Sequence, residues 1–178
     1  MAKRPVLPAE TLSADTQVFF DVLNNEPDFS VVVVSCAYLD ACLGSILERY
    51  LLQSTVSTKL LDARTGALGT LTARSDACYA LGLISKQIYQ DLRVLAELRN
   101  QVAHHHLMLS FSTAAVAKAC RSLKYAETLK RWDRDDGELM FKPAQLEDPR
   151  TRFVMTVVLM SQRLLLIALG VKGVEKAA

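Results

Sequence analysis

The segment from Ser85 to His106 limits the fold more than any other stretch, because it holds the longest amphipathic helical pattern in the chain. Ser85 is a favourable N-cap, since its hydroxyl can accept a hydrogen bond from an unpaired N–H group in the first helical turn. Apolar residues follow at three- and four-residue spacing, which places them on one helix face. These residues are Ile88, Leu92, Leu95, Leu98 and Val102. Other apolar helix faces in the chain must therefore cover this one.

The composition favours helices as the partners of this segment. A globule of 178 residues fits one domain, and it buries roughly 70% of its unfolded surface. Hydrophobic residues make up 51% of the chain and charged residues 22%, which excludes a disordered protein. The 7 glycines and 5 prolines are few for the many turns of a β-sheet protein. We therefore expect an all-α fold.

Helical patterns and capping residues predict a single-domain helical bundle of about six to seven helices around two long central helices. The helical domain is expected at residues 13–170, with an exposed loop at 133–147, a leader at 1–12 and a tail at 171–178. The predicted helices run from Ser13 to about Asn25, from Asp28 or Ser30 to about Leu52, from Thr70 or Thr72 to Leu81, from Ser85 to His106, from Ser112 to Trp132 and from Asp148 to Gly170, with one short helical turn after Leu52.

The longest apolar stripes are expected to cover one another in the core. This predicts that the stripe of the Ser85–His106 helix packs against Val34, Tyr38 and Leu159.

Charge and cysteine content indicate a cytoplasmic protein that does not read DNA directly. The net charge is +2, from 21 basic and 19 acidic residues, so binding to DNA should be weak or indirect. No helix-turn-helix pattern with a basic reading helix is present. The four cysteines form no C-x-x-C pair and lie in apolar helical patterns, which fits a reducing compartment. They are Cys36, Cys42, Cys78 and Cys120.

An arginine, an amide and three histidines gather at the end of the central pattern, in Arg99-Asn100 and His104-His105-His106. A guanidinium can bind a scissile phosphate and an imidazole can transfer a proton, which is the chemistry of metal-independent RNA cleavage. Residues five apart lie about 140° apart on a helix, so a second copy of the chain or a bend at Ala103 would have to complete the site. The alternative is structural, with these side chains capping helix ends. Consecutive histidines point about 100° apart, so no metal is expected, and no cofactor motif is present.

The block Leu60–His105 resembles the mannitol operon repressor family. The resemblance rests on LG-x-L-x-x-R, Y-x-LG-x-I, Y-x-D and LR with a trailing histidine. In this chain these are Leu68, Gly69, Leu71 and Arg74; Tyr79, Leu81, Gly82 and Ile84; Tyr89 and Asp91; and Leu98, Arg99 and His104. The resemblance implies an all-helical regulator of transcription in sugar uptake that works through protein contacts. Its partner would be a component of the phosphotransferase system or a DNA-binding regulator. The expected binding residues are Gly69, Arg74, Tyr79, Gly82, Tyr89, Asp91 and Arg99.

The R-N-x-x-x-H element is also similar to that of the HEPN superfamily. That resemblance implies a ribonuclease site at a homodimer interface, built from Arg99, Asn100 and His104. By helix geometry His106, seven residues after Arg99, shares the face of Arg99 and is the alternative histidine. RNA would then be the partner. Of the two functions, we expect the regulator rather than the enzyme.

Overall fold

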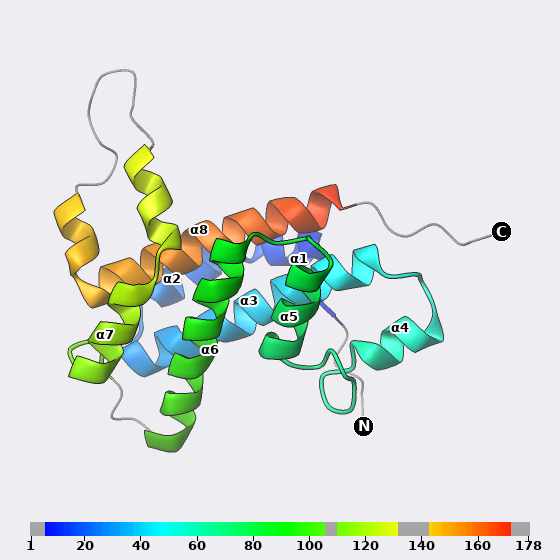
Figure 1. Ribbon diagram of the computed structural model, residues 1–178, viewed down its shortest axis with the longest axis horizontal. Helices are drawn as coiled ribbons and strands as arrows, with labels where there is room; N and C mark the ends of the chain where they lie inside the picture. The colour runs from blue at the N-terminus through cyan, green and yellow to red at the C-terminus, as the bar shows by residue number, and fades with distance from the viewer. Residues whose placement is uncertain (1–5, 106–109, 132–142, 172–178) are drawn as a thin grey trace.

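The computed structural model describes residues 6–105, 110–131 and 143–171, and these contain helices and no β-strand (Figure 1). The all-α prediction is confirmed. The α-helices are α1 (Ala9–Ala14), α2 (Thr16–Asn25), α3 (Asp28–Tyr50), α4 (Thr55–Leu60), α5 (Leu71–Ala80), α6 (Lys86–His105), α7 (Ala114–Ser122) and α8 (Pro149–Gly170). Two 3-10 helices, η2 (Tyr125–Arg131) and η3 (Pro143–Glu147), lie between α7 and α8.

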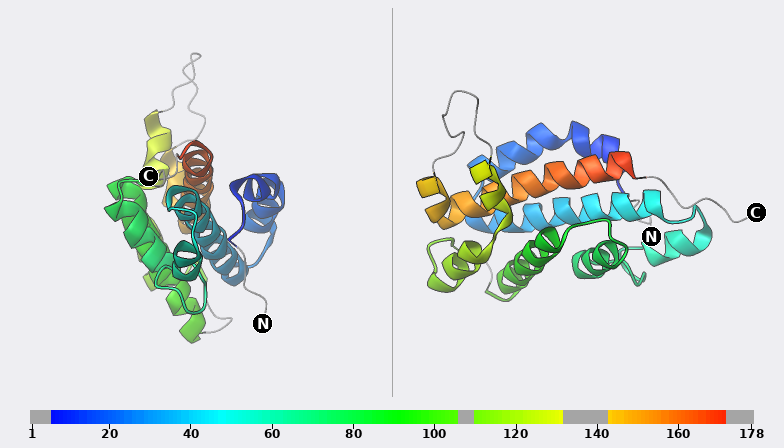
Figure 2. Two further views of the ribbon diagram at one scale, coloured as in Figure 1. Left: turned by 90° about the vertical axis from the view of Figure 1, so that its right-hand side faces the viewer. Right: turned by 45° about the horizontal axis from the view of Figure 1, so that its top comes forward.

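Helix α3 lies at the centre of the molecule. It contacts α1, α2, α5, α6 and α8, and it runs side by side with α8 (Figures 1 and 2). The right view of Figure 2 shows α1 and α2 on one side of this pair and α5, α6 and α7 on the other. By length and composition alone, α3 and α8 could each span a membrane. The contacts around α3 make it the core helix of the bundle.

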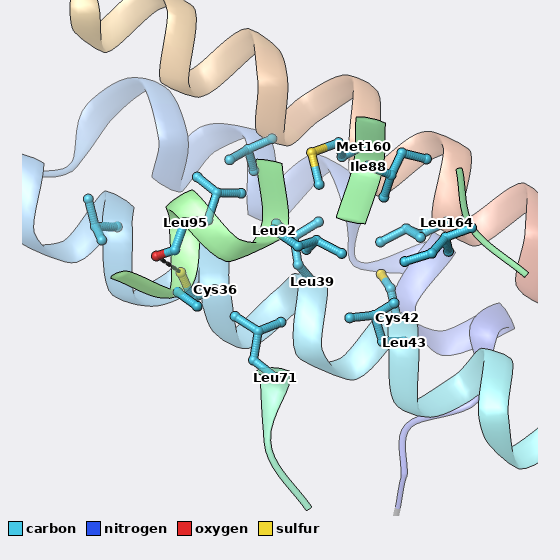
Figure 3. Close-up of a cluster of buried hydrophobic side chains, with 14 of the residues drawn as sticks. Cys36, Leu39, Cys42, Leu43, Leu71, Ile88, Leu92, Leu95, Met160 and Leu164 are labelled. Atoms are coloured by element: carbon cyan, nitrogen blue, oxygen red, sulfur yellow. Dashed lines mark hydrogen bonds between the residues drawn. The ribbon is translucent and has the colours of Figure 1, made fainter. Parts of the chain in front are cut away.

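The apolar stripe of α6 is buried against α3, as predicted. Ile88, Leu92 and Leu95 are 2%, 1% and 0% exposed. The Cys36 thiol of α3 donates to the Leu95 carbonyl at 3.4 Å. Figure 3 shows Leu39 of α3 in the same buried cluster as Leu92 and Leu95 of α6. The side chain of Val102 lies outside the described residues.

The predicted partners of this stripe were wrong. Tyr38 faces α1 and α2, because its hydroxyl donates to the Leu12 carbonyl at 2.6 Å and its ring stacks on Phe19 at 3.9 Å between centroids. Val34 lines the same side of α3 as Tyr38. Leu159 is half-buried on the outer side of α8. Because α3 is apolar on almost every face, its sequence does not mark which face meets α6.

Three predicted caps are confirmed. The Thr70 hydroxyl accepts from the Ala73 N–H at 3.2 Å, and the Ser85 hydroxyl accepts from the Ile88 N–H at 3.3 Å. The Asp148 carboxylate accepts from the Thr151 N–H at 2.8 Å, with proline at the start of α8. Each cap depends on residues within one turn, so local sequence predicts it well.

Three of the predicted element boundaries differ from the structure. The first helix starts at Ala9 rather than Ser13, because Ala9 and Leu12 are 0% and 2% exposed and pack into the core. The helix expected from Ser112 to Trp132 ends at Ser122, and η2 follows it. Part of the predicted loop 133–147 is η3, where Leu146 is 1% exposed.

All four cysteines are free and buried. Burial raises the pKa of each thiol, in Cys36, Cys42, Cys78 and Cys120, to about 12. They therefore act as small apolar core residues.

We predict that Leu95→Asp prevents folding, because it places an unpaired charge in the core of a protein whose total stability is about 5–15 kcal/mol. Leu95→Ala should fold and lose about 2–5 kcal/mol. Gln90→Asp on the exposed side of α6 is the matched control and should leave the melting temperature nearly unchanged. Circular dichroism melts measure all three, and a cooperative melt for Leu95→Asp near that of the wild type contradicts the packing of α6.

Candidate functional site

The buried guanidinium of Arg74 joins three segments of the chain. It is 5% exposed. Its Nε donates to the Leu68 carbonyl at 2.9 Å and Nη2 donates to the Leu61 carbonyl at 3.1 Å. Nη1 donates to the carboxylate of Asp40 on α3 at 2.8 Å. This family-motif arginine thus fixes the loop before α5 onto α3, and it is not free to bind a partner.

Both family-motif glycines are required by the backbone. At Gly69, a Cβ would lie 2.5 Å from the Asp62 carbonyl oxygen. Gly82 has φ +71° just after α5, where the Leu83 N–H donates to the Cys78 carbonyl at 2.8 Å. This bond and the glycine form a Schellman turn, which sets the angle between α5 and α6.

The carboxylate of Asp91 caps η2 from within α6. Asp91 is 1% exposed, and its Oδ2 accepts from the Lys124 N–H at 2.9 Å and the Tyr125 N–H at 2.7 Å. Gln87 donates to Oδ1 at 3.0 Å. Burial raises the pKa of Asp91, against the effect of these hydrogen bonds. The motif position Asp91 is therefore structural, a role that only the tertiary contact with η2 reveals.

The two motif tyrosines lie together on the surface. Tyr79 of α5 and Tyr89 of α6 stack at 4.5 Å between ring centroids and 9° between ring planes. Tyr79 is 40% exposed and the neighbouring Leu81 is 42% exposed. Beside them, Arg93 pairs with Asp76 at 3.7 Å. We call Asp76, Tyr79, Leu81, Tyr89 and Arg93 the tyrosine patch.

A hydrogen bond to Asp76 raises the pKa of Tyr89. The hydroxyl of Tyr89 is thus held as a donor to a carboxylate that also pairs with Arg93. The tyrosine patch combines aromatic and aliphatic surface with oriented polar groups, the mixture that protein interfaces favour.

Arg99 and Asn100 are both exposed on α6, and Arg99 Nη1 donates to Asn100 Oδ1 at 3.5 Å. Arg99 lines a cavity of about 290 Å³ together with Asp40 and Thr70. Burial raises the pKa of Asp40, while the nearby Arg74 and Arg99 oppose that shift.

The backbone of α6 shows no bend between Arg99 and His104 that would bring the predicted catalytic group onto one face. Helix α6 continues through Ala103 to His105, so Arg99 and His104 stay about 140° apart around its axis. The side chains of His104 and His105, and all of His106, lie outside the described residues.

Two further arginines, in the first turn of α8, escaped the sequence analysis. Arg152 is 6% exposed, and it donates to the carbonyls of Leu146 and Leu123 at 2.8 Å each and to Glu127 at 3.1 Å. Arg150 pairs with Asp28 at the start of α3. In the sequence, these residues appear only as two arginines at the start of an apolar helix. That pattern does not reveal partners as distant in sequence as Asp28 and Leu123.

We predict that Asp91→Ala destabilises the fold, because it leaves the buried N–H groups of Lys124 and Tyr125 without an acceptor, at about 1–3 kcal/mol each. Asp91→Asn retains an oxygen acceptor and should lose less. Thermal and urea unfolding measure both, with the exposed Glu97→Gln on α6 as control.

The pH dependence of the same variants gives a second measurement. Burial raises the folded-state pKa of Asp91, so the folded protein binds this proton more tightly than the unfolded chain. The carboxyl's contribution to the free energy of unfolding therefore falls as the pH rises from about 3.9, the ordinary aspartate value, to the raised folded value. The stability of wild type relative to Asp91→Asn should fall across that window, and a rise there contradicts the assignment.

Comparisons with known proteins identify the family and relatives of the same fold. The sequence profile described as Mannitol repressor matches residues 45–165. A chain in the X-ray structure of the MtlR–HPr complex from Escherichia coli has a TM-score of 0.64 and 19% identity, over 85% of this chain and 98% of that chain. The structure of YggD from Shigella flexneri 2a, a possible transcriptional regulator, has a TM-score of 0.61 and 14% identity, over 90% of this chain and 99% of that chain. No curated protein matches the sequence. Because the matched residues 45–165 make up more than half of the 178-residue chain, this protein belongs to the mannitol repressor family.

Proposed function

We propose that this protein is a cytoplasmic transcriptional regulator that works through protein–protein contacts made by the tyrosine patch. The observation that carries the proposal is the exposed stack of Tyr79 on Tyr89 beside Leu81. Stacked aromatic rings lose little conformational entropy on binding and supply large contact areas, which makes tyrosine a frequent interface hot spot.

The other motif residues support this choice by exclusion. Arg74 and Asp91 are buried and fully engaged in holding the fold, and Gly69 and Gly82 serve the backbone. Tyr89 is half-buried against the core, whereas Tyr79, stacked on it, is 40% exposed. A contact with another molecule accounts for this exposed aromatic side chain beside Leu81.

A phosphotransferase-system protein of the HPr type is the proposed partner. The E. coli relative with the same fold is found in a complex with HPr. Direct reading of DNA is not part of the proposal, because a net charge of +2 supplies little attraction for phosphates. Regulation would then depend on the partner, or on a separate DNA-binding regulator.

We predict that Tyr79→Ala and Leu81→Asp each weaken binding to HPr from the same organism by tenfold or more, about 1.4 kcal/mol, because each removes apolar contact at a hot spot. Isothermal titration calorimetry measures the affinity. Val56→Asp is the matched control, since Val56 is 64% exposed on α4, outside the patch, and this variant should bind like wild type.

Circular dichroism must show that the variants are folded. If HPr binds the folded wild type and both patch variants equally, another surface carries the interaction. If HPr does not bind the wild type at all, the proposed partner is wrong.

A second candidate function is the metal-independent ribonuclease. Its support is the exposed pair Arg99 and Asn100, of which Arg99 lines a cavity. This function requires His104 or His106 to reach the scissile phosphate.

The test is cleavage of a broad RNA panel in the presence of chelator. Under our first proposal, no cleavage is expected from wild type, Arg99→Ala or His104→Ala. Cleavage that leaves a cyclic phosphate, disappears in both of these variants and persists in the exposed control Arg121→Ala would establish the nuclease instead.

A further inference from the structure

The outer face of α8 carries an apolar stripe that the described part of the chain leaves uncovered. The most apolar stretch of α3 is 61% buried, whereas the most apolar stretch of α8 is only 44% buried. Leu166 and Leu169 are 64% and 46% exposed, and Met155 and Leu159 are half-buried. With Gln162, which is exposed, these five residues form what we call the α8 stripe.

The spacing within the α8 stripe is that of a coiled-coil seam. The five positions follow at intervals of four, three, four and three residues. At 100° per residue they fall within about 80° of the helix circumference. Alternating four- and three-residue spacing is the a/d pattern through which helices pair with other helices.

A charged partner is not favoured by this surface. The α8 stripe contains no charged residue, and its one polar member is Gln162 near the middle. Arg163 borders the stripe on the side of η2, where its charge opposes the raised pKa that burial gives Tyr125. A single amide within an apolar seam is a common device for fixing the register between identical helices.

The position of η2 sets the direction of pairing. A groove of about 360 Å³ between η2 and α8 is lined by Tyr125 and Thr128 on one side and Leu159 and Leu166 on the other. The right view of Figure 2 shows η2 beside the N-terminal half of α8, while the C-terminal half is free on that side. In an antiparallel pair, each η2 would meet the free half of the other α8.

We propose that the α8 stripe is the seam of a homodimer in which α8 packs antiparallel against α8 of a second copy of this chain. In antiparallel seams an a position lies level with a d position, so Leu159 meets Leu169 of the second copy and Leu166 meets Gln162 of the second copy. The two Gln162 side chains lie about 6 Å apart along the axis, close enough for their amides to hydrogen-bond.

The expected dimer is weak. A stable interface uses about 20–30 residues on each side, and the α8 stripe with the flank of η2 supplies fewer. We therefore expect dissociation in the micromolar range, with monomer prevailing in dilute solution.

The first test is sedimentation velocity of the full chain between roughly 1 µM and 1 mM, the range that brackets such an interface. The wild type should shift from monomer to dimer. Leu166→Asp should keep the melting temperature and raise the dissociation constant at least tenfold. Val18→Asp is the control: Val18 is 66% exposed and lines a different apolar groove, between α2 and α3, and this variant should dimerise like wild type.

The second test fixes the direction by disulfide trapping. A mixture of Leu159→Cys and Leu169→Cys should cross-link under mild oxidation, whereas either variant alone should not. In the antiparallel register two copies of residue 159 lie about 15 Å apart along the axis, beyond the roughly 7 Å limit between Cα atoms for a disulfide. The four native cysteines are buried and should not compete.

Three results would overturn the proposal: a monomer at every concentration, dissociation by Val18→Asp but not by Leu166→Asp, or self-cross-linking of Leu159→Cys alone. A monomeric wild type that loses HPr binding in Leu166→Asp would assign the α8 stripe to that partner. A monomeric wild type that binds phosphatidylcholine vesicles through Leu166 would assign it to a membrane. Each of these outcomes is independent of the tyrosine patch on α5 and α6.

Discussion

The packing of α3 against α1, α2, α5, α6 and α8 is the constraint on which the rest of the structure depends. Its Cys36 face meets α6 and its Tyr38 face meets α1 and α2, while α8 runs along its length. Besides this apolar packing, polar contacts hold the neighbours of α3 in place. Arg74 does this for the loop before α5, and Arg150 ties the start of α8 to the start of α3.

The buried arginines Arg74 and Arg152 donate mainly to backbone carbonyls. Arg74 donates to the carbonyls of Leu61 and Leu68 and Arg152 to those of Leu123 and Leu146, and each also donates to one carboxylate. A guanidinium has several donors in a rigid plane, so one side chain can satisfy acceptors from separate segments. Removing such a residue would leave several buried acceptors unpaired at once.

The sequence predicts local features well and spatial assignments less well. The caps at Thr70, Ser85 and Asp148 follow from adjacent residues, and the apolar stripe of α6 follows from its period. The face of α3 that meets α6 could not be predicted, because apolar residues lie on most sides of this helix and its few charged residues do not show which side meets which partner. The sequence also does not predict that the residues of the tyrosine patch lie together. Its two rings come from different helices, and they stack only because the turn at Gly82 and the packing of α5 on α6 bring them together.

The burial of the four cysteines has a consequence for the chemistry of the whole protein. Because burial raises the thiol pKa values far above neutral pH, each sulfur is almost entirely protonated in the folded protein. Alkylating reagents and peroxide act on the thiolate, so the folded protein should resist both while the unfolded chain reacts readily. The rate at which the thiols are labelled would then report how often the core opens, which gives a measure of local unfolding without any change to the sequence.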